Sequence, residues 1–126
     1  MKAFNTKIIA ISNQKGGVGK TTSAVNIAAF LAITETPTLL IDMDPQANAS
    51  TGLGIDITPK MQSIYDVLIN NIKISKCIQN TDIKYLDILP SCPKLSGAEI
   101  ELVSMFTRES ILKEAINNVY GKYKYI

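Results

Sequence analysis

Residues 12–22 read Ser-Asn-Gln-Lys-Gly-Gly-Val-Gly-Lys-Thr-Thr and directly follow an apolar run that ends at Ile11. The spacing is close to that of a phosphate-binding loop, in which a glycine and four free positions precede Gly-Lys-Ser/Thr. Gln14 stands at the first glycine position, and Lys15 adds a second lysine at the front of the loop. The stretch therefore predicts a site for the phosphates of a nucleotide.

Each residue type in this loop has a physical role. Glycines let successive backbone N–H groups point at a phosphate, and a helix that starts near Lys20 adds the positive end of its dipole. The ammonium group of Lys20 would contact the β- and γ-phosphates, and the hydroxyl of Thr21 would bind Mg²⁺. The alternative is a glycine-rich turn with two surface lysines. The elements predicted on both sides of the loop argue against that alternative.

A strand is predicted before the loop and a helix after it. Residues 7–13 contain an unbroken apolar run, which is typical of a parallel strand buried on both faces. Residues 36–42 form a second apolar run, and a strand–helix–strand unit implies parallel strands and a right-handed crossover. The predicted fold class is therefore α/β, with a parallel sheet flanked by helices as in P-loop NTPases. Residues 20–33 form the predicted helix, whose inward positions are Ala24, Ile27, Ala28, Leu31 and Ala32.

The later part of the chain continues the alternation of helices and strands. Residues 44–58 are polar and contain glycine, which predicts a loop with room for a helical turn. Ser96 and Glu99 have the spacing of a capping box and predict a helix that carries Ile100, Val103 and Phe106. The other predicted elements are a helix at 61–70, a strand at 85–89, a helix at 108–119 that stops at Gly121, and a strand that starts at 123–126.

Two carboxylates follow the second predicted strand. Asp42 and Asp44 stand where residues 36–42 leave the sheet, and ligands of open α/β sheets bind at the carboxyl ends of strands. We expect this strand to lie beside the strand of residues 7–13, which places both carboxylates near the phosphates. A carboxylate there holds a Mg²⁺-bound water or orients the water that attacks the γ-phosphate. The alternative is a helix cap or a loop carboxylate.

Composition limits the other classes of function. The chain has 126 residues and a net charge of +2, which is too mild to argue for nucleic-acid binding by itself. It contains no histidine, which excludes histidine general-base chemistry. Cys77 and Cys92 lack metal-ligand spacing and suit a reducing compartment. No apolar run approaches the roughly 20 residues of a membrane helix, and no signal peptide is recognised, so we expect a single soluble, cytoplasmic domain.

The residues from Lys15 to Thr22, together with Asp42-Met43-Asp44-Pro45-Gln46, resemble the ParA/Soj family of chromosome- and plasmid-partition ATPases. This family belongs to the deviant Walker A group, which includes the cell-division regulator MinD. The resemblance extends to Leu89-Pro90-Ser91 and to residues 97–102, and Asp-Pro-Gln favours the partition branch. Ala47 stands where the family often has glycine.

The resemblance implies ATP and Mg²⁺ as cofactors and assigns roles to single residues. Lys15 reaches the phosphates of a partner subunit in an ATP-dependent homodimer, and Asp44 activates the attacking water. Thr21 and Asp42 lie on the Mg²⁺ side. The residues that surround the phosphates are Lys15, Gly16, Gly17, Val18, Gly19, Lys20, Thr21 and Thr22.

Family members are about twice as long as this chain, because a doubly wound fold requires several more strands. We therefore expect residues 1–126 to be the N-terminal part of one domain, with an unpaired sheet edge. The Walker B aspartate and the DNA-binding surface are expected beyond Ile126. The expected partners are a centromere-binding ParB-type protein and non-specific DNA on the nucleoid, without a membrane. The alternatives are a nucleotide-binding fragment without activity, a membrane-cycling regulator similar to MinD, and a metabolic phosphotransferase of the same fold.

Overall fold

The computed structural model of the chain describes residues 3–12, 19–105 and 108–126. In these residues one sheet has the strand order β1–β3–β2. β1 (Thr38–Ile41) and β3 (Leu86–Leu89) are parallel, in a register that pairs Thr38 with Leu86. β2 (Gln79–Asn80) pairs antiparallel with β3, so the sheet is mixed where an all-parallel sheet was predicted. β2 can run antiparallel because a short turn, and no crossover helix, joins it to β3.

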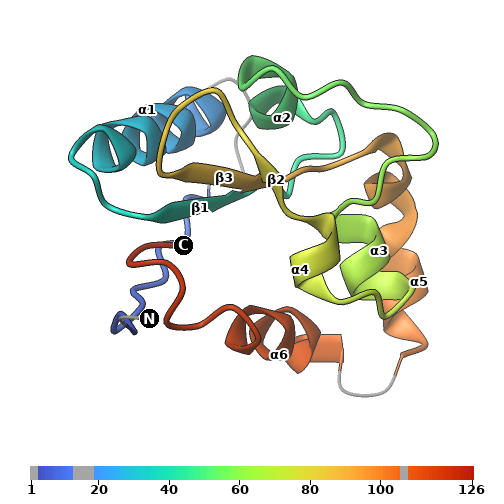
Figure 1. Ribbon diagram of the computed structural model, residues 1–126. Coiled ribbons are helices and arrows are strands. Elements are labelled where there is room, and N and C mark those ends of the chain that lie inside the picture. Colours follow the sequence, from blue (N-terminus) through green and yellow to red (C-terminus); the bar gives the residue numbers. More distant parts are fainter. Residues whose placement is uncertain (1–2, 13–18, 106–107) are drawn as a thin grey trace.

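α1 (Lys20–Ile33) has the bounds that the sequence predicts. It packs on one face of the sheet, where Ala28 and Ala32 are buried against Leu86 (Figure 1). The small alanine side chains let the helix approach the strands closely. Ile27, predicted to face inward, has 45% of its surface exposed. The prediction was wrong at this position because the alanines, and not the larger isoleucine, form the contact line.

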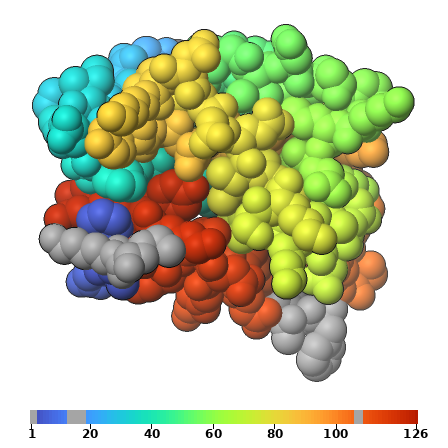
Figure 2. All heavy atoms as spheres, in the orientation of Figure 1, coloured from blue at the N-terminus to red at the C-terminus, as the bar shows by residue number. Residues whose placement is uncertain are grey.

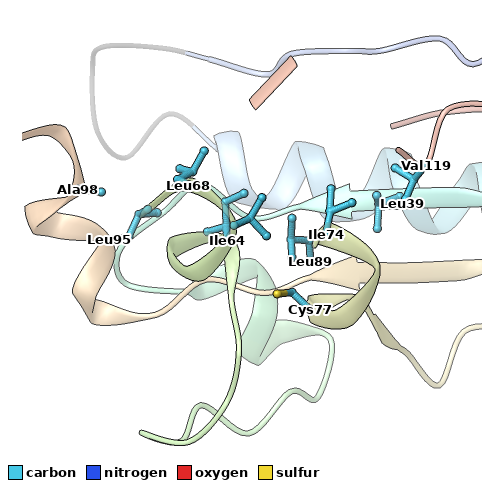
Figure 3. Close-up of a cluster of buried hydrophobic side chains, with 10 residues drawn as sticks. Leu39, Ile64, Leu68, Ile74, Cys77, Leu89, Leu95, Ala98 and Val119 are labelled. Carbon is cyan, nitrogen blue, oxygen red and sulfur yellow. The ribbon is translucent and has the colours of Figure 1, made fainter. Parts of the chain in front are cut away.

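The other face of the sheet carries the larger core. Leu39 and Leu89 of the sheet form one buried cluster with Ile64 and Leu68 of α3 (Figure 3). Val119, after α6, belongs to the same cluster. Figure 1 shows α3, α4 and α5 grouped at one end of the sheet, with α6 below them. The helices in chain order are α2 (Asn48–Gly52), α3 (Ile64–Ile69), α4 (Ile74–Cys77), α5 (Ala98–Val103) and α6 (Ile111–Asn117), with 3₁₀ turns at Pro93–Gly97 and Arg108–Ser110.

One capping box exists among the described helices, at a place the sequence did not indicate. The hydroxyl of Ser63 accepts a hydrogen bond from the backbone N–H of Tyr65, and Asp66 accepts one from the N–H of Ser63. The capping box predicted at Ser96 and Glu99 was wrong. Ser96 lies within the 3₁₀ turn that Pro93 begins, and its hydroxyl donates to the carbonyl of Pro93.

Two large apolar side chains of the helix predicted after Ser96 are exposed. Ile100 and Val103 have 79% and 62% of their surfaces exposed, and Ala98 is the buried residue of α5. α5 contacts α3 and the 3₁₀ turn, Ala98 belongs to the larger core cluster, and the Tyr65 hydroxyl donates to the Glu101 carboxylate. Phe106, predicted on the same helix, lies outside the described residues.

The end of the chain lies between two earlier segments. Tyr125 forms parallel bridges with Lys7 on one side and with Thr38 of β1 on the other. The backbone N–H of Ile9 donates to the carbonyl of Ile126, 2.8 Å away, and the N–H of Leu39 donates to the carbonyl of Tyr125. The prediction that residues 7–13 lie beside 36–42 was therefore wrong, because residues 124–126 separate them. In Figure 2 the N-terminal segment, in blue, lies against the red C-terminal part of the chain.

The N-terminal segment pairs as a strand does, but it is not buried on both faces as predicted. Ile8 and Ile9 have 56% and 49% of their surfaces exposed. An apolar groove separates this segment from α1 and β1, and Ile9, Ile11 and Ile126 are among its lining residues. Separately, no helix in the described part of the chain is long and apolar enough to cross a bilayer.

Candidate nucleotide-binding site

The predicted phosphate loop leads into the first turn of α1. Gly19 precedes the helix with φ +83°, in the left-handed region where a side chain would be strained. Gly19, the residue before α1, has no side chain to cap the helix, and the first turn, formed by described residues, contains no acidic residue. The positive end of the helix dipole is therefore available for an anion. Lys20, Thr21 and Thr22 form the first turn, as predicted, whereas Lys15, Gly16, Gly17 and Val18 lie outside the described residues.

This end of α1 and the carboxyl ends of the strands share one edge of the sheet. The connection from α1 to β1 is a tight turn, so α1 runs antiparallel to β1 and begins at the edge where β1 ends. Figure 1 shows the N-terminal end of α1 next to α2, and the two helices pack together. Asp42 and Asp44 follow β1 at this edge. The structure therefore brings the start of α1 and the two carboxylates to the same edge of the sheet.

The carboxylate of Asp44 is held from two sides and remains half-buried. One oxygen accepts the backbone N–H of Gln46 at 3.0 Å, and the other accepts the side-chain amide of Asn48 at 2.9 Å. Ala47 between them has φ +56°, so the loop turns sharply at this residue. A glycine would adopt this conformation with less strain. The turn keeps the Asp44 side chain at the strand end.

The carboxylate of Asp42 has a different environment. Only 4% of the residue is exposed, and its side chain meets α2. One oxygen accepts the backbone N–H of Asp44 at 3.0 Å, and the other accepts both the N–H and the hydroxyl of Ser50, at 2.9 and 2.6 Å. The two aspartates are therefore not equivalent. The Asp42 carboxylate is buried and binds groups of the loop and of α2, whereas the Asp44 carboxylate is the more accessible of the two.

Asn48 and Ser50 contact the two aspartates but were not predicted as parts of this site. Their polar side chains stand in a stretch rich in Asn, Ser and Thr, where no periodicity separates a buried residue from an exposed one. Ser50 is fully buried and Asn48 is exposed, two positions apart in α2. Only the packing of α2 on the strand ends distinguishes them.

The donor set at this edge fits a magnesium–nucleotide. Thr21 offers a hydroxyl and Asp42 and Asp44 offer carboxylates, and Mg²⁺ prefers such oxygen ligands together with substrate phosphates. Lys20 places an ammonium group at the positive end of α1. The arrangement is chemically suited to hold a polyphosphate, to neutralise its charge and to orient a water beside it.

The groups with clearly shifted pKa values lie away from this edge. Burial raises the pKa of the Cys77 thiol to about 11, with a further contribution from Asp66. Burial and the hydrogen bond to Asp87 raise the pKa of Tyr123. The pKa of Tyr65 is raised mainly by its hydrogen bond to Glu101. These groups belong to the body of the protein and do not mark a further titrating centre at the candidate site.

Comparison with known proteins shows the family of the chain. Residues 6–126 match the protein family described as AAA domain. The chain is 49% identical over 120 residues to the chromosome partitioning protein ParA of Myxococcus xanthus. It is 48% identical over 120 residues to the sporulation initiation inhibitor protein Soj of Bacillus subtilis. Each alignment covers 95% of this chain, but only 42% of that ParA and 47% of that Soj.

A solved structure confirms the fold class. Cobyrinic acid a,c-diamide synthase from Mycobacterium smegmatis, with bound ADP and magnesium, superposes with a TM-score of 0.90 at 35% sequence identity. The match covers 95% of this chain and 49% of that chain. This chain thus spans about half the length of each of these proteins.

The fold and the start of α1 define a P-loop NTPase-type α/β protein. The chain belongs to the AAA domain family, and the resemblance to the ParA/Soj partition proteins is confirmed by the identities with ParA and Soj.

Proposed function

We propose that this chain is the nucleotide-binding part of an ATP-hydrolysing partition protein, which acts as an ATP-dependent dimer switch in chromosome or plasmid segregation. The observation that carries the proposal is that the first turn of α1, which begins at Lys20, lies at the same sheet edge as Asp42 and Asp44. The names of the ParA and Soj relatives give the biological class. The ADP and magnesium in the solved relative support ATP and Mg²⁺ as cofactors.

The proposed roles follow from this arrangement. Residues 15–22 surround the phosphates, with the ammonium group of Lys20 on the β- and γ-phosphates. The Thr21 hydroxyl would hold Mg²⁺. The Asp42 carboxylate would face the same ion, although its two oxygens already accept three hydrogen bonds. The ion, when bound, neutralises charge that develops on the phosphates.

The proposed catalytic pair is Lys15 and Asp44. The half-buried Asp44 carboxylate orients the water for attack on the γ-phosphate. Lys15 supplies a cation to the nucleotide of a second subunit and thereby does the work of an arginine finger. Hydrolysis would then require two copies of the protein, which links the nucleotide state to dimerisation. The proposed partners beyond the second copy are a ParB-type protein and nucleoid DNA.

A second candidate is an ATP-dependent metabolic enzyme of the same fold. The name of the solved relative, a diamide synthase, favours it. The two candidates differ in whether hydrolysis needs a second subunit or an acceptor substrate. A partition protein hydrolyses ATP without any acceptor, at a rate that rises with protein concentration.

The experiment is a titration of the intact protein with a fluorescent ATP analogue and Mg²⁺, followed by a phosphate-release assay. Lys20→Ala should abolish nucleotide binding, and Lys113→Ala, at an exposed position on α6, is the matched control. Lys15→Ala and Asp44→Ala should bind the analogue but lose hydrolysis. Undiminished phosphate release in both of these variants would contradict the proposed mechanism.

A further inference from the structure

A buried chain of hydrogen bonds joins three segments behind the candidate site. The hydroxyl of Ser50, in α2, donates to the Asp42 carboxylate at 2.6 Å. The same hydroxyl accepts the backbone N–H of Ser91, which follows β3, at 3.1 Å. Ser50 and Ser91 are fully buried, and Asp42 is 4% exposed. Ser50 therefore uses its hydroxyl both as donor and as acceptor, between the ends of two neighbouring strands.

The chain of hydrogen bonds continues to Asp44. The carboxylate of Asp42 that Ser50 holds also accepts the backbone N–H of Asp44. The Asp44 carboxylate accepts the amide of Asn48, which begins α2, the helix that contains Ser50. The backbone of α2 completes a ring of contacts, because Asn48 and Ser50 both belong to this helix. The Asp44 backbone is thus held by the carboxylate that Ser50 holds, and the Asp44 side chain is held by the Gln46 N–H and by an amide of the same helix as Ser50.

We propose that Ser50 is a positioning residue, which acts through Asp42 and the start of α2 to hold the Asp44 carboxylate in its place at the sheet edge. The inference rests on the proposed function, in which Asp44 orients the attacking water. Ser50 does not reach the nucleotide itself, because it is fully buried behind the loop.

The physical reason is the burial of Ser50, Ser91 and Asp42. If the Ser50 hydroxyl is removed, a buried carboxylate loses one partner and the N–H of Ser91 loses its acceptor, and both losses are costly for buried groups. The carboxylate of Asp42 then turns toward other donors and moves the backbone at Asp44. A displacement of about 1 Å at a reacting group lowers a rate by up to about 100-fold.

The test compares Ser50→Val with Ser50→Thr in the intact protein. The two new side chains have nearly the same shape, and only threonine keeps the hydroxyl. We expect kcat for ATP hydrolysis to fall between about 10- and 100-fold in Ser50→Val, with KM and the affinity for the fluorescent analogue little changed. Ser50→Thr should retain most of the wild-type kcat. The control Thr51→Val removes the neighbouring exposed hydroxyl, which bonds only within α2 and its first turn, and should leave kcat unchanged.

The outcomes separate this inference from the proposed function. A folded Ser50→Val with wild-type kcat, or a folded Ser50→Thr as slow as Ser50→Val, overturns the positioning role. Far-ultraviolet circular dichroism reports folding, and Ser50→Ala replaces Ser50→Val if the latter does not fold. Wild-type protein that neither binds nor hydrolyses ATP instead overturns the proposed function. Slow hydrolysis in Asp44→Ala together with normal hydrolysis in Ser50→Val retains the proposed function and rejects the inference.

Discussion

Tyr123 donates a hydrogen bond from its hydroxyl to the carboxylate of Asp87 on β3, over 2.7 Å. The other oxygen of Asp87 accepts the amide of Asn80 on β2, also at 2.7 Å. Asp87 thus connects the last residues of the chain to two strands of the sheet. The contact joins segments 36 residues apart in sequence and stabilises the insertion of residues 124–126 beside β1.

Replacing Tyr123 by phenylalanine should lower the free energy of unfolding by about 1–2 kcal/mol, because a hydrogen bond to a charged acceptor is lost. Urea denaturation followed by circular dichroism measures the change. The matched control is Tyr120→Phe, which removes a hydroxyl that donates to the neutral amide oxygen of Asn5 at an exposed position. An equal loss in both variants would contradict a special role of the Asp87 contact.

Alkaline pH should destabilise the protein through Cys77. Burial raises the pKa of this thiol to about 11 in the folded state, above its value in the unfolded chain. The neutral thiol therefore contributes stability that is complete below about pH 8.5 and is lost progressively as pH rises toward 11.

The free energy of unfolding should fall by on the order of 2 kcal/mol as the Cys77 thiol ionises. The loss is measured as the fall of the urea denaturation midpoint between pH 7 and pH 11. This midpoint should fall less steeply with pH in Cys77→Ala than in the wild type. Tyr123, whose pKa is also raised, contributes in the same direction at the alkaline end. Identical slopes for wild type and Cys77→Ala would show that the thiol is not responsible.

Ser91→Ala should stabilise the protein by about 1 kcal/mol, because a buried hydroxyl without a hydrogen bond costs free energy. The hydroxyl of Ser91 is buried and has no partner among residues 3–12, 19–105 and 108–126. The matched control is Ser63→Ala at another fully buried serine. Because the Ser63 hydroxyl caps α3, its loss should destabilise by about 1 kcal/mol. Opposite signs in thermal or urea unfolding confirm the prediction, and a loss of stability in both variants refutes it.

Glu35→Gly should raise the free energy of unfolding by up to about 1 kcal/mol, because a non-glycine residue in the left-handed region is strained. Glu35 has φ +59° in the exposed turn between α1 and β1, so no buried contact is lost. Asn71→Gly is the control, since Asn71 has φ +54° and asparagine tolerates this conformation. Thermal unfolding should show a gain for Glu35→Gly that exceeds any gain for Asn71→Gly.

The predicted bounds of a helix were correct where the sequence signals at its two ends were unambiguous. α1 begins after Gly19 and ends at Ile33 because the glycine loop and the polar turn at 34–36 bound a regular apolar pattern. The prediction of the capping box was wrong because two stretches of the sequence have the same pattern. Ser63 with Asp66 and Ser96 with Glu99 have the same spacing, and only the 3₁₀ turn begun by Pro93 prevents the second pair from capping a helix.

The sequence by itself determined the α/β class, the position of α1 and the residues that carry the candidate chemistry, because glycine spacing, helical periodicity and strand composition act locally along the chain. Only the tertiary structure decided that residues 124–126 separate Lys7 from Thr38, and that Asp42 is buried while Asp44 remains accessible. Strand order depends on contacts between segments more than 80 residues apart. The difference between the two aspartates depends on α2, which places the Ser50 hydroxyl against one carboxylate and the Asn48 amide against the other.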